Sequence, residues 1–185
     1  AIRDSAFYLD YQPIISLDTG RIAAFEALVR WRHPTRGLVG PDDFIGIAED
    51  TGMITQIGYL TLVESCTQLA AWQRQFGAAA PSAICVNLSS RQFFQPDLVY
   101  QIERALMETG LDPRSLKMEI TESAIMEQVE SVSSALTRLK SLGVKLAIDD
   151  FVKVYSSLSY LHQSPFHTRK IDRSFMSRSA VAGYI

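Results

Sequence analysis

Residues 145–151 read Lys-Leu-Ala-Ile-Asp-Asp-Phe, a short apolar run that ends in two adjacent carboxylates. An apolar run of this length, entered from a helical pattern closed by Gly143, is typical of a buried parallel strand. Side chains alternate along a strand, so Asp149 and Asp150 point to opposite sides unless the backbone turns there. Where the strand becomes a loop, both can reach one metal cluster, and a divalent cation is the usual counter-charge. The alternative is a helix N-cap, although capping uses one Asp and not two.

The composition indicates one ordinary globular domain of 185 residues, 47% hydrophobic and 21% charged. The net charge of -2 gives no electrostatic case for binding duplex nucleic acid or an anionic membrane. No apolar run approaches the roughly 18 residues that span a bilayer. Two lone cysteines, Cys66 and Cys85, argue against a disulfide framework and fit a reducing compartment. We therefore expect a cytoplasmic domain, whose longer parent protein has room for a membrane anchor elsewhere.

Strand and helix patterns alternate along the chain. Strands are predicted over residues 8–15, 21–30, 83–88, 116–120, 145–151 and 169–172. Helices are predicted over residues 41–52, 55–76, 96–109, 129–142 and 156–162. The close turn at 18–20 predicts that the first two strands form an antiparallel pair, and residues 33–37 are predicted to be a loop. The repeated βα units that follow predict a parallel sheet, either open and doubly wound or closed as a barrel.

Polar residues at the strand ends favour the barrel. Each of several separate apolar strands carries at least one of them, namely Glu26, Asn87, Glu119, Asp149 with Asp150, and Lys170 with Asp172. Such groups are costly inside apolar strands unless they converge, and a barrel directs its strand ends to one mouth. Carboxylate and amide oxygens suit Mg²⁺ or Mn²⁺ and not zinc. The three histidines are scattered and form no competing cluster.

An ordered set of motifs resembles the EAL domain family. It comprises Glu26-Ala-Leu28 followed by Arg30-Trp31, residues 41–45 (PDDFI) with 48–52 (AEDTG), 86–89 (VNLS), 119–123 (EITES), 149–151 (DDF) and 155–158 (YSSL). The resemblance runs from residues 11–13 (YQP) to 170–172 (KID), nearly the whole chain. It implies an α/β fold, a modified TIM-type (β/α)8 barrel with an antiparallel first strand pair. It also implies a metal-dependent phosphodiesterase that cuts cyclic di-GMP to linear pGpG.

The same resemblance implies roles for individual residues around two Mg²⁺ or Mn²⁺ ions. Metal ligands would be Glu26, Asn87, Glu119, Asp149 and Asp150, with Asp149 shared between the ions and Asp150 on the second. Lys170 would lie close to the nucleophilic water, and Glu122 would steady the loop after Asp150. Gln12 and Arg30 resemble the substrate contacts, and Asp172 belongs to the same mouth. Two simpler readings stay open: Arg30 as a surface charge packed on Trp31, and Lys170 in a structural ion pair.

The chain departs from the family pattern at several places. Val152 and Val154 stand where the loop after the Asp-Asp pair carries glycines, and β-branched residues are poor at positive φ and at close backbone approach. Further on, His167 and Arg169 replace the usual Asp and Leu. A complete barrel needs about 250 residues. We therefore expect residues 1–185 to be one EAL domain without its last two strands and the late metal-ligating Glu, part of a longer multidomain protein.

Three functions follow from these observations. The first is a cyclic di-GMP phosphodiesterase, favoured by the retained metal-ligand set. The second is a cyclic di-GMP receptor that binds without cutting, favoured by the altered loop. The third is a protein-interaction module, against which the retained Gln12 and Arg30 count. The family also implies a homodimer through the barrel and an upstream sensor or GGDEF-type domain, and we expect the isolated 185 residues to hydrolyse cyclic di-GMP poorly or not at all.

Overall fold

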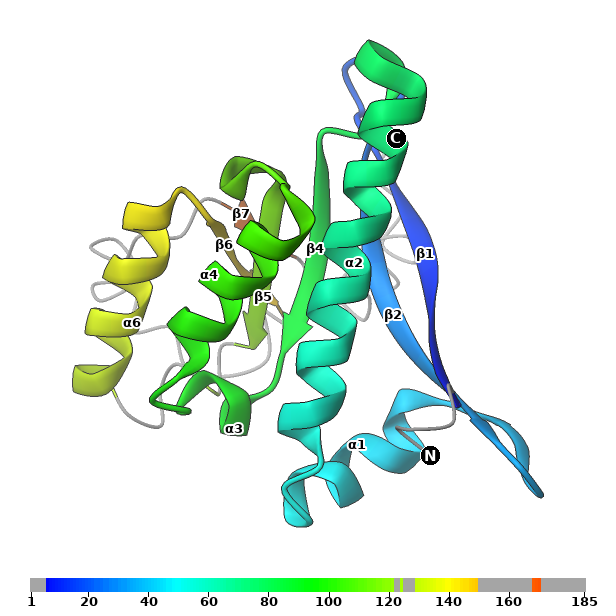
Figure 1. The fold of residues 1–185 in the computed structure, drawn as a ribbon, viewed down its shortest axis with the longest axis vertical. Helices are drawn as coiled ribbons and strands as arrows, with labels where there is room; N and C mark the ends of the chain where they lie inside the picture. Colours follow the sequence, from blue (N-terminus) through cyan, green and yellow to red (C-terminus); the bar gives the residue numbers. More distant parts are fainter. Residues whose placement is uncertain (1–5, 122–123, 125–128, 150–167, 171–185) are drawn as a thin grey trace, which may run out of the picture.

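The computed structural model of the chain describes residues 6–121, 124, 129–149 and 168–170 (Figure 1). Strands β1 (Phe7–Ile15) and β2 (Ile22–His33) form the long antiparallel pair predicted from the sequence, with Gln12 opposite Glu26. Gly20 in the connecting turn has a φ of 66°, a conformation that glycine adopts without steric cost. The antiparallel pair therefore opens the sheet as expected.

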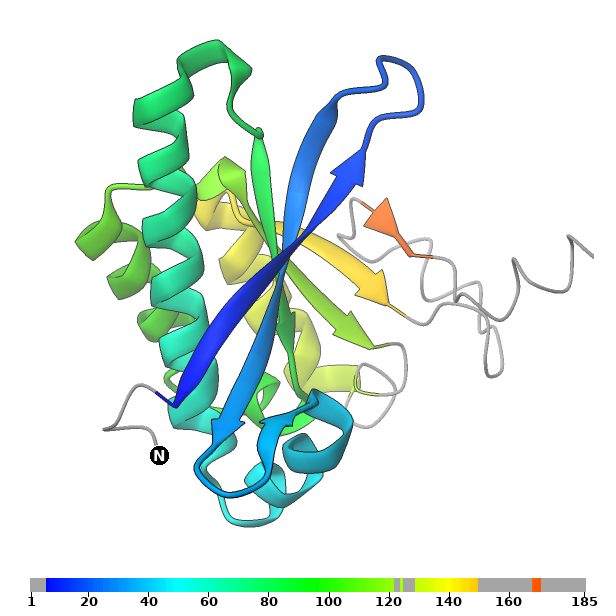
Figure 2. The ribbon, with the colours of Figure 1, turned by 90° about the vertical axis from the view of Figure 1, so that its right-hand side faces the viewer.

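The remaining long strands continue the sheet in parallel. They are β4 (Ala83–Leu88), β5 (Leu116–Thr121), β6 (Lys145–Asp149) and β7 (Thr168–Arg169), in the order β1-β2-β4-β5-β6-β7. Helices α2 (Ile54–Phe76), α4 (Leu98–Thr109) and α6 (Val129–Leu142) cover one face of this twisted sheet (Figures 1 and 2). The fold is the α/β, TIM-barrel-like arrangement expected, here a partial barrel. None of the helices in the described ranges is long and apolar enough to cross a membrane.

The two faces of the sheet differ in chemistry because side chains alternate along each strand. One face carries large apolar residues that pack under the helices, among them Ile84, Met118, Ile120 and Leu146, none more than 1% exposed. Burial of such side chains stabilises the fold by about 1.5–3 kcal/mol each. The opposite face carries small residues, such as Ala24 and Cys85, beside the polar residues of interest. The face that the helices do not cover therefore carries the polar side chains that could form a catalytic or binding site.

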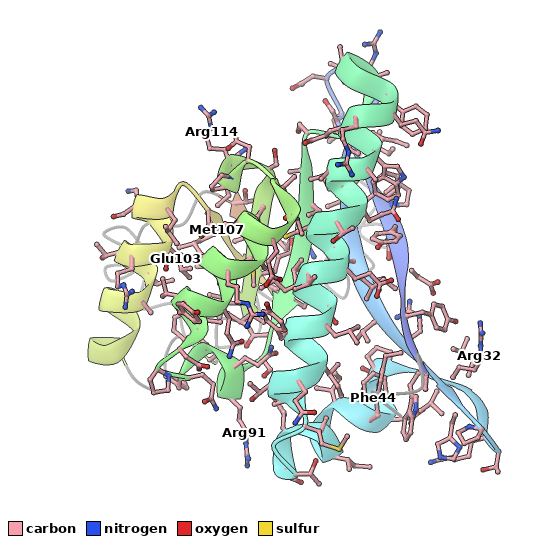
Figure 3. All side chains as sticks on the ribbon, in the orientation of Figure 1. Arg32, Phe44, Arg91, Glu103, Met107 and Arg114 are labelled. Atoms are coloured by element: carbon pink, nitrogen blue, oxygen red, sulfur yellow. The ribbon has the colours of Figure 1, made fainter. Side chains whose placement is uncertain are left out.

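Short elements complete the structure. Strand β3 (Gly37–Val39) pairs with β2, and helix α1 (Pro41–Asp50) follows with Pro41 at its start. Helix α3 (Ser90–Phe93) follows β4, and 3-10 turns span Gly77–Ala79 and Pro113–Ser115. Phe44 of α1 points toward the β1–β2 pair, whereas Arg32 and Arg114 project into solvent (Figure 3). Phe44 belongs to a second apolar cluster with Phe7 and Trp31.

The sequence-based boundaries are close to those observed, with informative exceptions. The predicted loop at 33–37 is the turn of a hairpin, because β2 extends to His33 and Trp31 pairs with Val39. The helix predicted from residue 96 begins at Leu98, with Asp97 at its N-cap position. Helix α3 was not predicted. The predicted helix over 156–162 lies outside the described residues.

Candidate active site

Polar side chains from neighbouring strands meet on the open face of the sheet. The strand register explains this: Glu26 is level with Cys85, and Asn87 is level with Glu119. Partners in register point to the same side, as do residues two positions apart on one strand. Asp149 closes β6 level with Thr121, two residues beyond Glu119. The face therefore presents four polar groups that the sequence placed on separate strands, and Lys170 follows β7 as a fifth.

Direct contacts join this cluster. The Nδ2 of Asn87 donates to Oε1 of Glu26 at 2.8 Å. The Nζ of Lys170 donates to Oε2 of Glu26 at 2.8 Å and to Oε2 of Glu119, and it lies 3.9 Å from Oδ2 of Asp149. The Lys170 ammonium thus lies where three carboxylates converge. The expected convergence of these five residues on one face is confirmed, and so is the ion pairing of Lys170.

Burial shapes the electrostatics of the cluster. Glu119 is only 2% exposed, and burial raises the pKa of its carboxyl above the ordinary value, an effect that the hydrogen bond from Lys170 opposes. Burial by itself lowers the pKa of Lys170, but the hydrogen bonds to Glu119 and Glu26 outweigh it and hold the pKa of the ammonium above its usual range. The cluster therefore keeps a cation among its carboxylates.

The donors fit a hard divalent cation by their chemistry. Carboxylate oxygens of Glu26, Glu119 and Asp149 and the amide oxygen of Asn87 are ligands that Mg²⁺ and Mn²⁺ accept. Within the described ranges, no group of three or more Asp, Glu, His or Cys side chains is arranged to hold a metal ion. In this arrangement the Lys170 ammonium, held by two glutamates, supplies the positive charge that a metal would supply.

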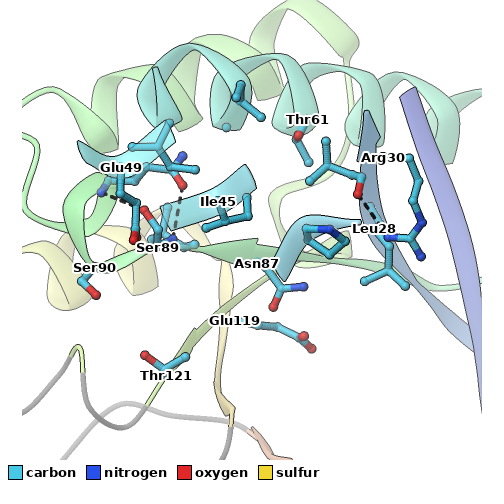
Figure 4. Close-up of a pocket in the computed structure, with 18 residues that line it drawn as sticks. Leu28, Arg30, Ile45, Glu49, Thr61, Asn87, Ser89, Ser90, Glu119 and Thr121 are labelled. Atoms are coloured by element: carbon cyan, nitrogen blue, oxygen red, sulfur yellow. Dashed lines mark hydrogen bonds between the residues drawn. The ribbon is translucent and has the colours of Figure 1, made fainter. Parts of the chain in front are cut away.

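A cavity of about 320 Å³ adjoins the cluster. Figure 4 shows its lining: Asn87 and Glu119 extend from the sheet, Thr61 extends from α2, and Ile45 extends from α1. Its walls also include Leu28, Arg30, Glu49, Ser89, Ser90 and Thr121. A concave pocket that combines apolar walls with polar groups able to orient a ligand is the usual form of a small-molecule site. The cavity and the carboxylate cluster share Asn87 and Glu119, so a ligand in the cavity reaches the cluster.

Arg30 of β2 lines this cavity, and two neighbouring residues hold its guanidinium group in place. Its Nε donates to Oδ2 of Asp10 at 2.8 Å, and its Nη1 donates to the carbonyl oxygen of Val29 at 3.1 Å. Trp31, the next residue, points to the other side and stacks on Phe7 with ring centroids 5.7 Å apart. The alternation of β2 thus separates Arg30 from the Trp31 ring. Asp10, a partner that the sequence analysis did not single out, holds the guanidinium beside β1 at the edge of the cavity.

The structure tests the placement of some predicted residues and not of others. Gln12 lies opposite Glu26 in the β1–β2 register, on the same face as the cluster. Glu122, Asp150 and Asp172 lie outside the described residues, as do Val152, Val154 and His167. Sequence reasoning missed Asp10 and Gln92. A Ser-x-x-Gln pattern at 89–92 was present and signals a helix start, so Gln92 could have been found.

Comparisons with known proteins place this geometry in context. The sequence description of the EAL domain matches residues 1–183. A curated relative, the cyclic di-GMP phosphodiesterase NbdA of Pseudomonas aeruginosa, is 42% identical over 176 residues, which cover 95% of this chain and 22% of that protein. An uncharacterized signaling protein of Caulobacter vibrioides is 43% identical over 175 residues, 95% of this chain and 21% of that protein. The chain spans about a fifth to a quarter of the length of such relatives.

Solved structures agree with these sequence matches. The PaMucR phosphodiesterase in complex with c-di-GMP has a TM-score of 0.92 and 40% identity, covering 97% of this chain and 72% of that one. The EAL enzyme Bd1971, with cAMP and cyclic di-GMP bound, has a TM-score of 0.89 and 34% identity, covering 97% of this chain and 49% of that one. Both likenesses extend over nearly the whole chain.

Proposed function

Because the chain belongs to the EAL domain family, we propose that the protein containing it is a cyclic di-GMP phosphodiesterase that releases linear pGpG. One observation carries the proposal: Glu26, Asn87, Glu119 and Asp149 converge beside a cavity that Arg30 lines. NbdA carries the name cyclic di-GMP phosphodiesterase, and PaMucR is a phosphodiesterase solved with c-di-GMP. The family of phosphodiesterases is generally metal-dependent, which suits a cluster of this composition.

We assign each residue a part in hydrolysis. Glu26, Asn87, Glu119 and Asp149 would hold Mg²⁺ or Mn²⁺, with Asp150 at a second ion. When bound, such cations would supply a water of lowered pKa and would stabilise negative charge on the phosphate. Arg30 orients a phosphate oxygen through its guanidinium, which is suited to such contacts. Lys170 places positive charge beside the reacting phosphodiester. The oxygen of water then bonds to phosphorus, one P–O bond of the ring breaks, the leaving oxygen takes up the proton that the water gives up, and the ring opens to linear pGpG.

Three further residues extend this proposal. Gln12 shares the face of Glu26 and would contact the ligand there. Asp172 would belong to the same mouth, and Glu122 would steady the loop after Asp150. All three roles come from the family pattern.

A receptor without turnover is the second candidate. Two features favour it. The loop that follows Asp150 carries Val152 and Val154 in place of glycines, at a cost of about 1–3 kcal/mol for each residue forced into a strained conformation. Lys170 also already engages Glu26 and Glu119, so cations must compete with it. In this case cyclic di-GMP binds and pGpG does not form.

The setting of the domain is also a proposal. The relative MucR of Pseudomonas aeruginosa is named a bifunctional diguanylate cyclase and phosphodiesterase, which supports a GGDEF-type neighbour or a sensor in the parent protein. A homodimer through the barrel accords with the family. Two buried free thiols, Cys66 and Cys85, suit the cytoplasm, where cysteines stay reduced.

The experiment that tests the proposed function measures affinity and turnover on one preparation. Cyclic di-GMP is titrated by calorimetry with and without Mn²⁺, and pGpG is quantified by chromatography. Binding with Mn²⁺-dependent pGpG supports the phosphodiesterase. Binding without pGpG supports the receptor, and the absence of binding refutes both.

A further inference from the structure

Gly58 occupies the interior of helix α2, where glycine is less favourable than alanine. A Cβ atom built on Gly58 would lie 1.6 Å from Nε2 of Gln92 and 2.6 Å from its Cδ. The amide group of Gln92 therefore rests directly on the backbone of α2, in a notch that any larger residue would fill. Gly46, in the interior of α1, differs: a Cβ there meets nothing within 4 Å. A larger residue at position 58 would therefore displace the Gln92 amide, whereas one at position 46 would displace nothing.

The other end of the Gln92 amide is also engaged. Its Oε1 accepts a hydrogen bond from the backbone N–H of Ser89 at 3.2 Å, and Oγ of Ser89 accepts one from the N–H of Gln92 at 3.3 Å. This reciprocal capping box begins helix α3, and the dashed lines beside Ser89 in Figure 4 mark such bonds. Gln92 is only 9% exposed. Its amide cannot swing away from α2 without breaking the bond to Ser89.

Ser89 lies two residues beyond Asn87, at the end of β4. Leu88, the single residue between them, is packed in the main core, so this short piece of backbone is held at Ser89 by Gln92 and at Leu88 by the core. Asn87 holds Oε1 of Glu26 through its Nδ2. The cavity is lined by Gly58, Gln92, Ser89 and Asn87 together. A continuous series of contacts therefore runs from the notch in α2 to the amide of Asn87.

We infer that Gln92, seated on Gly58, is a positioning residue that fixes the end of β4 and with it the orientation of the Asn87 amide toward Glu26. The inference rests on the proposed function only in that Asn87 serves the site; the contacts themselves are independent of ligand. Residues that orient metal ligands from outside typically change metal affinity or activity by about 10–100-fold when altered. We expect an effect of that size from loss of the Gln92 acceptor.

The test compares variants that separate packing from positioning. Gln92→Glu keeps an acceptor for the Ser89 N–H, as glutamate does in capping boxes. Gln92→Met keeps similar volume without that acceptor. Gly58→Ala displaces the amide, and Gly46→Ala is the matched control, a Gly-to-Ala change in a helix with open space around it. The double variant Gly58→Ala with Gln92→Ala removes the clash while leaving the acceptor absent.

The first measurement needs no metal or substrate: the side-chain NH2 signal of Asn87 in a ¹⁵N-labelled chain, identified by its loss in Asn87→Asp. We expect Gly46→Ala and Gln92→Glu to leave this signal in place. Gln92→Met and Gly58→Ala should shift or broaden it. An unchanged signal in both of these variants overturns the inference, whatever the result for hydrolysis.

The second measurement is the dissociation constant for Mn²⁺ alone, by calorimetry, with thermal midpoints on the same samples. We expect Gln92→Met and Gly58→Ala to weaken Mn²⁺ binding about 10-fold or more. The double variant should recover thermal stability relative to Gly58→Ala but not Mn²⁺ affinity. The inference is wrong if the double variant recovers both thermal stability and Mn²⁺ affinity, or if Gln92→Met binds Mn²⁺ as tightly as Gln92→Glu. Either result would show that the contact between Gln92 and Gly58 is only structural. If the natural chain forms no pGpG but the variants still differ in Mn²⁺ affinity as expected, hydrolysis is refuted and the positioning role of Gln92 is not.

Discussion

The Nζ atom of Lys170 lies 2.8 Å from Oε2 of Glu26, although 144 residues separate the two in the sequence. The contact joins the end of β7 to β2, at opposite sides of the parallel part of the sheet. A flat open sheet would hold these strands far apart, since neighbouring strands are about 4.8 Å from each other. The sheet is therefore curved enough for its polar face to close around one point.

Replacement of Lys170 by Met should destabilise the metal-free protein. Glu26 and Glu119 would then face each other without their shared cation; a buried acceptor left without its partner costs about 1–3 kcal/mol, and a charged one costs more. Saturating Mn²⁺ should restore much of the lost thermal stability by neutralising the carboxylates. Thermal unfolding with EDTA and with Mn²⁺ provides the measurement. A Lys170→Met variant as stable as the natural protein in EDTA would show that the ion pair contributes little.

Divalent cations should control turnover. Mg²⁺ or Mn²⁺ should support pGpG formation, and Ca²⁺ should inhibit it, because the larger ion binds at longer distances and in looser geometry. Chelation should abolish activity, and re-addition of Mn²⁺ should restore it. Initial rates across a series of metal concentrations test this expectation. Activity that survives exhaustive chelation would exclude a metal-assisted mechanism.

Arg30→Lys should weaken cyclic di-GMP binding about 10-fold, the equivalent of about 1.4 kcal/mol, through loss of one good charge-assisted hydrogen bond. Lysine keeps the charge but lacks the planar fork that Asp10 and Val29 orient. Stability should change little, since the Asp10 partner is half exposed and surface ion pairs contribute about 0–1 kcal/mol. Calorimetric titration measures the affinity. Arg104→Lys, on the outer surface of α4, is the control, and equal affinity in the two variants would remove Arg30 from the ligand site.

The two thiols should be inert in the folded chain. Cys66 and Cys85 are both fully buried, and burial raises the pKa of each to about 12. A thiol-specific reagent at pH 8 should therefore label neither until denaturant is added, when both react. Rapid labelling of the native chain would contradict the burial of both thiols.

The same shifts predict a loss of stability in alkaline solution. A group with a raised folded-state pKa contributes its full stabilisation below the unfolded pKa, about 8.5 for cysteine, and loses it as pH rises toward the folded value. Denaturant midpoints should therefore fall between about pH 8.5 and pH 12. Cys66→Ala should show a shallower fall over this range than the natural chain. An identical slope in the two proteins would mean that Cys66 does not account for the loss.

The sequence predicted those strands and helices whose residue pattern alone distinguishes a strand from a helix. Alternation of apolar runs with helical repeats located β4, β5, β6 and the long helices, and the turn at 18–20 predicted the antiparallel pair. The polar residues at strand ends predicted the cluster, because parallel strands align their ends. These inferences need only local pattern and the general geometry of sheets.

Other features depend on contacts between distant segments. The pairing of Arg30 with Asp10 depends on the β1–β2 register, which the sequence does not state. The notch at Gly58 depends on the position of Gln92 in the folded chain. A lone glycine in a helical pattern indicates that some contact favours glycine there, but it does not identify the contacting residue. The position of Lys170 among three carboxylates follows from the curvature of the whole sheet. Such details arise from tertiary packing and had to be observed.

The most direct test of the proposed phosphodiesterase compares the natural protein with Glu26→Gln, which keeps the shape of a side chain that contacts both Asn87 and Lys170. Cyclic di-GMP affinity and the rate of pGpG formation are measured on both proteins with Mn²⁺ present. We predict that the full-length protein containing this chain binds cyclic di-GMP and forms pGpG, slowly because of Val152 and Val154, and that Glu26→Gln in that protein remains folded but loses turnover about 100-fold. Equal pGpG formation by the two proteins, or no binding of cyclic di-GMP by the natural one, would contradict this account.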